Sequence, residues 1–145
     1  MNADLAALYQ SVILDHNRRP RNFRALDHAT RGEGHNPLCG DRLTVFVRIA
    51  NGVVEEAAFQ GFGCAIATAS ASMMTESVTR RAVADACALA ARVEALLSAE
   101  GDGAGDDLGS LAALAGVRQF PLRVTCATLP WHAFAIACRG LGIGG

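Results

Sequence analysis

Hydrophobic residues recur at helical spacing close to the N-terminus of the chain. From Leu5 to Ile13 they fall three or four positions apart, which places them along one face of a helix. Asp4 comes directly before this pattern and is suited to be an N-cap or a first-turn acid. The pattern therefore predicts an amphipathic helix over about residues 4–16.

The period changes from helical spacing to alternation in the middle of the chain. Hydrophobic residues occupy every second position over 43–49, with Phe46 among the residues between them, which is typical of a strand with one buried face. Asn51 and Gly52 follow at once and predict a tight hairpin, because both turn positions need positive φ. Residues 53–60 are expected to form the partner strand. The Gly- and Pro-rich segment 31–41 leaves room for little more than a short edge strand.

Three segments in the second half of the chain are predicted to be helices. Residues 64–78 are rich in Ala and Ser and contain neither Pro nor Gly, and 81–99 carry a helical pattern of hydrophobic positions. A final helix is expected to begin at residue 126 or 127, after a proline turn, and to run to about 138. Residues 111–114 have room for a short helix at most.

The remaining segments carry few side chains that could be buried. Residues 100–109 are rich in Gly and Asp and are predicted to form a flexible surface loop, and the tail 140–145 is expected to be frayed. The sequence shows neither an internal repeat nor a linker between two cores. We therefore expect one domain over residues 1–145, of the α+β class, with a small antiparallel sheet of about three strands packed against several helices.

Composition and charge narrow the classes of function. The chain is 51% hydrophobic and 19% charged, with a formal net charge of −1, so its bulk charge predicts no binding to nucleic acid or to an anionic membrane. The most apolar helical stretch is interrupted by Asp85, Arg92 and Glu94, so no membrane-spanning helix is expected. The N-terminus lacks the positive start and apolar run of a signal peptide. We therefore expect a cytoplasmic protein whose thiols are kept reduced.

The five cysteines fall into two groups by their predicted positions. They are odd in number, widely spaced and without a Cys-x-x-Cys pair, which argues against a disulfide framework. Cys87 and Cys138 lie inside predicted helices beside hydrophobic residues, so packing in the core is their expected role. Cys39, Cys64 and Cys126 lie instead at the ends of predicted elements. Free backbone amides and a helix dipole would stabilise a thiolate there.

The second group of cysteines and a neighbouring aspartate suit a metal site. Cys39 and Asp41 flank a glycine, so one tight turn can direct both side chains toward a common centre. Cys64 and Cys126 bring the number of ligands to four, as a tetrahedral Zn²⁺ requires. The carboxylate is the natural ligand to exchange, because it is harder than the thiolates.

The charge of such a site needs a counterpart. Three thiolates and one carboxylate on a dication leave a formal charge of about −2, which calls for nearby cations or backbone donors. Arg123 lies three residues before Cys126 and is a candidate for this role, while an ordinary surface arginine is an equally good interpretation. The four histidines are expected to be structural or surface residues.

Five stretches of the chain carry specific motifs. They are residues 8–16, 20–23, 36–41, 61–74 and 120–132, and they include the sequences PRNF, NPLCGD and GFGCAI. Together they closely resemble the SufU branch of the IscU/NifU N-terminal domain family. The resemblance runs from about Leu8 to Ala137, which is nearly the whole chain.

The resemblance implies a site and a metal. In that family three cysteines and an aspartate meet in one exposed site, which carries over here to Cys39, Asp41, Cys64 and Cys126. The IscU branch has a histidine directly before its third cysteine, whereas this chain has Thr125. The segment between the second and third cysteines, at about 79–115, is also long. Both differences favour the SufU branch and imply a tightly bound zinc ion.

The resemblance also implies a reaction and partners. The chain would accept sulfur from a pyridoxal-phosphate cysteine desulfurase of the SufS type for downstream iron–sulfur assembly proteins, as a sulfurtransferase-like acceptor and activator. Cys39 is the expected acceptor because its loop can move, whereas Cys64 and Cys126 are expected to be fixed at helix starts. Cys39 would first have to leave the metal, because a zinc-bound thiolate is a less available nucleophile.

Two other functions stay open. The same ligands could hold Fe²⁺ or a [2Fe–2S] cluster in a scaffold protein that assembles and transfers the cluster. A purely structural zinc domain could act as a binding module. The absent histidine and the zinc-suited ligands favour sulfur transfer over the scaffold. A structural zinc domain predicts that Cys39→Ala abolishes folding, whereas sulfur transfer predicts a folded variant that no longer accelerates the desulfurase.

Overall fold

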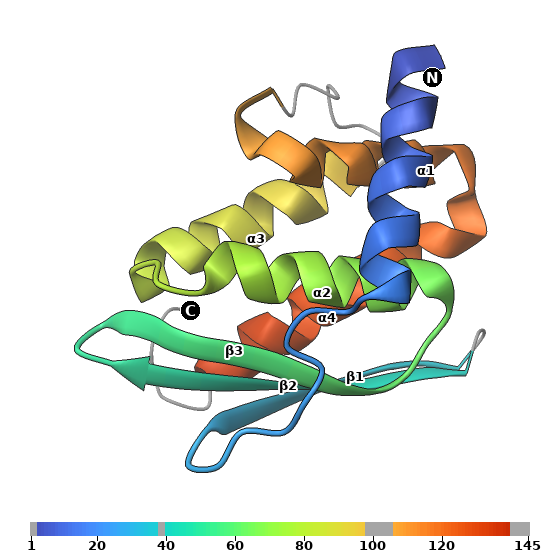
Figure 1. Ribbon diagram of the computed structural model, residues 1–145. Coiled ribbons are helices and arrows are strands. Elements are labelled where there is room, and N and C mark those ends of the chain that lie inside the picture. The colour runs from blue at the N-terminus through green and yellow to red at the C-terminus, as the bar shows by residue number, and fades with distance from the viewer. Residues whose placement is uncertain (1–2, 38–39, 98–105, 140–145) are drawn as a thin grey trace.

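Helices cover one face of a three-stranded antiparallel sheet (Figure 1). The computed structural model describes residues 3–37, 40–97 and 106–139. In chain order the elements are α1 (Ala3–Arg18), β1 (Thr30–Asn36), β2 (Asp41–Ala50), β3 (Val53–Phe62), α2 (Ala65–Val78), α3 (Val83–Leu97), the 3₁₀ helix η1 (Asp106–Gln119) and α4 (Pro121–Arg139). The predicted α+β class, with a small antiparallel sheet and several helices, is confirmed.

The sheet is a meander in which β2 lies between β1 and β3. The pairing of β1 with β2 ends at Asn36 opposite Asp41, so a short turn joins these two strands. The turn between β2 and β3 has φ of 54° at Asn51 and 74° at Gly52, as the sequence predicted for a tight hairpin. The predicted edge strand is β1.

Both faces of β2 carry buried side chains. Leu43 and Val47 are buried in the main core, which confirms the predicted buried face. Phe46 belongs to the opposite set of positions but is also buried, in a small cluster with Leu26 and Ala58. Leu26 comes from the connection between α1 and β1, so this connection shields part of the second face.

The helix α4 lies directly on β1 and β2. This close approach depends on Gly32, where a Cβ atom would stand 1.9 Å from the carbonyl oxygen of Ala133 and 2.7 Å from the backbone nitrogen of Ala137. Gly34, on the same face of the strand, would bring a Cβ atom to 2.9 Å from the side chain of Leu129. These two glycines therefore set how close α4 lies to the sheet.

A buried hydrogen-bond chain joins α2 to α4. The indole Nε1–H of Trp131 donates to Ser70 Oγ at 3.0 Å, and Ser70 Oγ donates to the carbonyl oxygen of Ala127 at 2.6 Å. All three residues are buried, so each polar group depends on its partner in the chain. The contact fixes the position of α4 along α2.

Two predicted boundaries are wrong. The final helix begins at Pro121 rather than at 126, because proline suits the first helical position as well as a turn. Residues 106–119 form a long 3₁₀ helix where a loop up to 109 and a short helix at 111–114 were predicted. Leu111, Leu114 and Val117 are buried, and their three-residue spacing keeps them on one face of a 3₁₀ helix.

Some predictions fall on parts of the chain that the structure does not describe. The first residues of the predicted flexible loop, 100–105, and the predicted frayed tail, 140–145, lie outside the described residues. Each helix within the described ranges is too short or too polar to span a membrane.

Candidate metal centre

Asp41 is the first residue of β2 and directly follows the turn that joins β1 to β2. The N–H of Gly40 donates to the carbonyl oxygen of Asn36 at 2.8 Å, and Gly40 has a φ of 73°, which glycine adopts readily. Asp41 is only 2% exposed. Its Oδ1 accepts a hydrogen bond from the backbone N–H of Cys64 at 3.0 Å.

The second carboxylate oxygen of Asp41, Oδ2, is the atom of this site that most clearly indicates a cation-binding site. Oδ2 is buried and has no hydrogen-bond partner among the described residues. Burying a polar atom without a partner is unfavourable, and burying a charged one more so. A cation beside Oδ2 would remove this penalty.

Cys64 lies at the N-terminus of α2, as the sequence predicted. It is the N-cap residue, and its Sγ accepts the backbone N–H of Ala67 at 3.4 Å. Its sulfur therefore lies next to the free backbone N–H groups of the first turn of α2. Its side chain is half-buried.

Cys126 lies inside α4 and not at its start. Because α4 begins at Pro121, the prediction that Cys126 is fixed at a helix start is wrong, and the helix dipole argument does not apply to it. The side-chain amide Nδ2 of Asn36 donates to Cys126 Sγ at 3.7 Å. Both residues are buried. Sequence reasoning missed Asn36, although it is the first residue of the NPLCGD motif.

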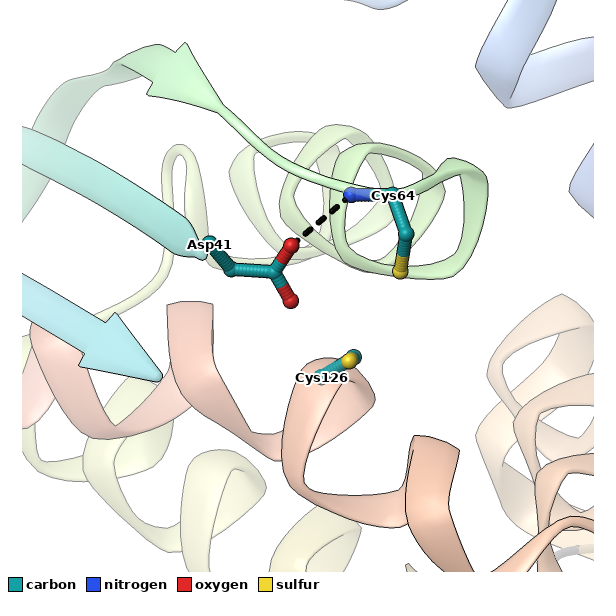
Figure 2. Close-up of side chains that lie close together, drawn as sticks. All are labelled: Asp41, Cys64 and Cys126. Carbon is teal, nitrogen blue, oxygen red and sulfur yellow. Dashed lines mark hydrogen bonds between the residues drawn. The ribbon is translucent and has the colours of Figure 1, made fainter. Parts of the chain in front are cut away.

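The side chains of Asp41, Cys64 and Cys126 point into one space between β2, α2 and α4 (Figure 2). Their ligand atoms all lie within 4.8 Å of one another. Zinc bonds of about 2.0–2.3 Å in a tetrahedral site place ligand atoms roughly 3.5–4 Å apart. Small movements of the three side chains would bring their ligand atoms to these distances. Two sulfurs and one unpartnered oxygen therefore suit a divalent metal such as zinc.

The other predicted site residues have different outcomes. Cys39 lies outside the described residues, so its place as the fourth ligand stays a prediction. Arg123 is exposed in the first turn of α4, and its role in balancing charge also stays a prediction. The prediction of an exposed site is wrong for two of the residues. Asp41 and Cys126 are buried, while Cys64 is partly exposed.

Comparison with known proteins gives one family. The model of the NifU-like N-terminal domain matches residues 8–127. The zinc-dependent sulfurtransferase SufU of Bacillus subtilis (strain 168) is 39% identical over 132 residues, which cover 91% of this chain and 90% of that protein. The iron–sulfur cluster assembly scaffold protein IscU of Streptococcus pyogenes serotype M1 is 38% identical, with coverage of 91% and 83%.

A solved structure shares the architecture. It is the crystal structure of a candidate iron–sulfur cluster assembly scaffold protein for the SUF system from Fervidobacterium islandicum AW-1. It superposes with a TM-score of 0.80 at 28% identity and covers 90% of this chain and 96% of that chain. The arrangement of helices on a three-stranded sheet is therefore shared at nearly full length.

Proposed function

The chain belongs to the NifU-like N-terminal domain family, and on that basis we propose that it is a zinc-dependent sulfur-transfer protein of iron–sulfur cluster assembly. It accepts persulfide sulfur from a cysteine desulfurase of the SufS type. The observation that carries the proposal is the buried, unpartnered oxygen of Asp41 close to two thiols. The similarity to a relative named as a zinc-dependent sulfurtransferase supports it.

Asp41, Cys64 and Cys126 would hold the zinc ion together with Cys39. Bound zinc would supply a dication that keeps the thiols deprotonated at neutral pH. The N–H of Cys64 orients the Asp41 carboxylate. The amide of Asn36 orients the sulfur of Cys126, as hydrogen bonds around a metal site commonly do.

Cys39 is the proposed sulfur acceptor. Its thiolate attacks the outer sulfur of the desulfurase persulfide, so a new S–S bond forms on Cys39. The S–S bond of the desulfurase persulfide breaks, and the desulfurase cysteine leaves as a thiolate. The other two thiols suit anchoring better, because Cys126 is buried inside α4 and Cys64 caps α2.

A scaffold that assembles and transfers a [2Fe–2S] cluster is the second candidate function. The observation that favours it is the IscU relative from Streptococcus pyogenes, which is nearly as similar as the SufU relative. The residue before Cys126 opposes it. Thr125 stands where the IscU branch has its histidine and offers no nitrogen ligand.

A desulfurase assay tests sulfur transfer directly. Sulfide release from cysteine by a cognate SufS-type enzyme is measured with and without this protein. We expect acceleration by the wild type and none by a folded Cys39→Ala variant, while Cys87→Ala, outside the site, retains the wild-type effect. Unchanged turnover with the wild-type protein would overturn the proposal.

Metal analysis separates the two candidate functions. Protein purified without oxygen is analysed for zinc and iron, and its absorbance spectrum is recorded. Sulfur transfer predicts about one zinc ion per chain and no visible absorption band. Iron together with sulfide-to-iron charge-transfer bands would support the scaffold instead.

A further inference from the structure

Two large apolar side chains are almost fully exposed, and both lie close in sequence to ligands of the candidate metal centre. Phe62, the last residue of β3, is 82% exposed, and Leu122, in the first turn of α4, is 81% exposed. The other exposed large hydrophobic side chains within the described residues are at most 50% exposed. Single hydrophobic residues on a surface are common, so the meaning of these two depends on what lies next to them.

A short piece of backbone connects each of these residues to the metal centre. Phe62 precedes Cys64 by two residues, and the chain runs directly from the end of β3 to Cys64 (Figure 2). Leu122 precedes Cys126 by four residues, so it lies one turn earlier on the same face of α4. The sulfurs of Cys64 and Cys126 lie within 4.8 Å of each other. Phe62 and Leu122 therefore border the centre from two different elements.

The thiols of the centre can be reached from solvent on the side of Cys64. Asp41 and Cys126 are buried, whereas Cys64 is partly exposed and the preceding Gly63 is exposed. A sulfur atom carried on the cysteine of another protein has to come within about 4 Å of its acceptor in the centre. The surface of that protein would then cover the exposed residues around Cys64, with Phe62 among them.

The residues at this end of the sheet combine apolar area with charge. Protein interfaces have an apolar centre and a polar rim. Phe62 and Leu122 supply the apolar area, and a partner that covers them would remove nearly all of it from water. Arg42 lies opposite Phe62 in the pairing of β2 with β3 and is exposed, so it supplies a charged edge. This combination is typical of a docking surface for another protein.

We propose that Phe62 and Leu122 are the apolar anchors by which this chain docks its sulfur donor, a cysteine desulfurase, over the metal centre. The inference rests on the proposed function and adds to it the residues that hold the donor in place. The two side chains transfer no sulfur themselves. They bring the persulfide to the centre, and the donor carries apolar side chains next to its persulfide cysteine to receive them.

Acceleration of the desulfurase tests this docking role on the full-length, zinc-loaded protein. Sulfide release from cysteine by the cognate enzyme is followed as the concentration of this protein is raised, for the wild type, Phe62→Ser and Leu122→Ser. The half-saturating concentration reports docking, and the maximal rate reports sulfur transfer. We expect the half-saturating concentration to rise roughly tenfold for Phe62→Ser and by a smaller factor for Leu122→Ser. The maximal rate should stay unchanged, because the thiols are the same.

Two further variants separate docking from other effects. Val53→Ser is the matched control, because Val53 is the first residue of the strand that ends at Phe62 and is also exposed. A strand of ten residues spans roughly 30 Å, so this variant should match the wild type. Phe62→Leu keeps an apolar side chain and should recover most of the affinity. Circular dichroism and zinc content are measured throughout, and glutamine replaces serine at a position where the serine variant loses either.

Two results would overturn the docking role and leave sulfur transfer standing. One is an unchanged half-saturating concentration in either folded, zinc-loaded variant, while the wild type accelerates the desulfurase. The other is a fall in the maximal rate alone, which would place these residues in the transfer step. A wild-type protein that fails to accelerate the enzyme would instead overturn the proposed function, and this inference with it.

A second copy of this chain is the other protein that could cover Phe62 and Leu122. Analytical ultracentrifugation of the wild type and Phe62→Ser distinguishes the two occupants. Docking of the desulfurase predicts the same oligomeric state for both proteins. A wild-type dimer that Phe62→Ser dissociates would overturn the proposal and assign this surface to self-association.

Discussion

Asn36 connects the β1–β2 turn to the sulfur of Cys126. Its backbone carbonyl oxygen accepts the N–H of Gly40, and its side-chain amide donates to Cys126 Sγ at 3.7 Å. A donor to a thiolate disperses its charge and fixes the direction of the sulfur lone pairs. A residue outside the proposed ligand set would therefore influence how well Cys126 binds a metal.

We expect Asn36→Ala to bind zinc roughly 10–100-fold more weakly than the wild type, the range typical for losing a partner of a metal ligand. The variant keeps the backbone contact with Gly40, so the loss should fall on Cys126. Competition with a chromophoric chelator measures the affinity. Asn17→Ala, at an exposed position of α1, is the control and should match the wild type. Equal affinities for the two variants would contradict the role of Asn36.

Asp41→Asn should have opposite effects on stability with and without zinc. In the zinc-free protein the substitution removes a buried charge whose Oδ2 has no partner, and we expect a gain of about 1 kcal/mol in the free energy of unfolding. With zinc it removes a charged ligand, and the variant should be less stable than the wild type.

Urea unfolding in excess zinc and in excess chelator measures this reversal. The wild type and Asp41→Asn are compared under both conditions with the same denaturant slope. A variant that is destabilised in both would show that the unpartnered oxygen costs the zinc-free protein nothing.

At the scale of elements, the sequence predicted structure wherever one period dominated. The alternation in β2 and the turn at Asn51 and Gly52 allowed one interpretation. Pro121 allowed two, because proline marks a turn and also suits the first residue of a helix. The full length of η1 could not be predicted, because its buried residues lie three positions apart within a Gly-rich segment, and this spacing differs from that of an α-helix.

The candidate site was predictable only in part, for a similar reason. Cys64 follows a glycine turn and precedes a long helical pattern, so its place as N-cap could be derived locally. The burial of Cys126 and its contact with Asn36 depend on which side of α4 faces β1. Gly32 lies against the backbone of Ala133 and Ala137, so this side of α4 faces β1. Such a contact between distant segments has no local signal in the sequence.

Ser70 offers a test of how α2 and α4 are held together. Ser70→Ala would leave the indole N–H of Trp131 and the carbonyl oxygen of Ala127 without this partner, at a cost of about 1–3 kcal/mol in the free energy of unfolding. Ser77→Ala is the matched control, because the Ser77 hydroxyl donates to the carbonyl oxygen of Met73 in its own helix at 2.8 Å. Urea unfolding of both variants measures the difference. A similar loss of stability in both variants would show that the hydrogen bonds between α2 and α4 stabilise the protein no more than a bond within one helix.

At the scale of the whole molecule, a polar network holds the N-terminal helix on the rest of the fold. Nδ1 of His16 lies 2.8 Å from Ser72 Oγ, and the backbone N–H of Arg21 donates to the same oxygen at 2.8 Å. The side-chain amide of Asn22 donates to Thr75 Oγ1 at 3.1 Å. The network joins α1 and the segment after it to α2.

The pKa of His16 makes this network sensitive to pH. Burial lowers the pKa of His16 from its usual 6.5, and the positive charge of Arg21 lowers it further, against the opposing effects of Glu76 and Asp15. As the pH falls below 6.5, His16 therefore takes up a proton in the unfolded chain, whereas in the folded protein it stays neutral down to a lower pH. His16 contributes its full stability above this pH, and the contribution is lost as the pH falls toward the lowered pKa.

We expect the free energy of unfolding to fall as the pH is lowered from about 7.5 to about 5, and His16→Asn to weaken this dependence. Asparagine does not titrate and keeps a polar atom near the position of Nδ1.

His132→Asn, on the exposed side of α4, is the control, and its free energy of unfolding should depend on pH as that of the wild type does. The pKa of Asp15 is also lowered, from 3.8, so this carboxylate acts only at more acidic pH. The candidate metal ligands are the same in all three proteins, so the difference between the two variants isolates the effect of His16. Parallel curves for His16→Asn and the wild type would show that this histidine does not make stability depend on pH.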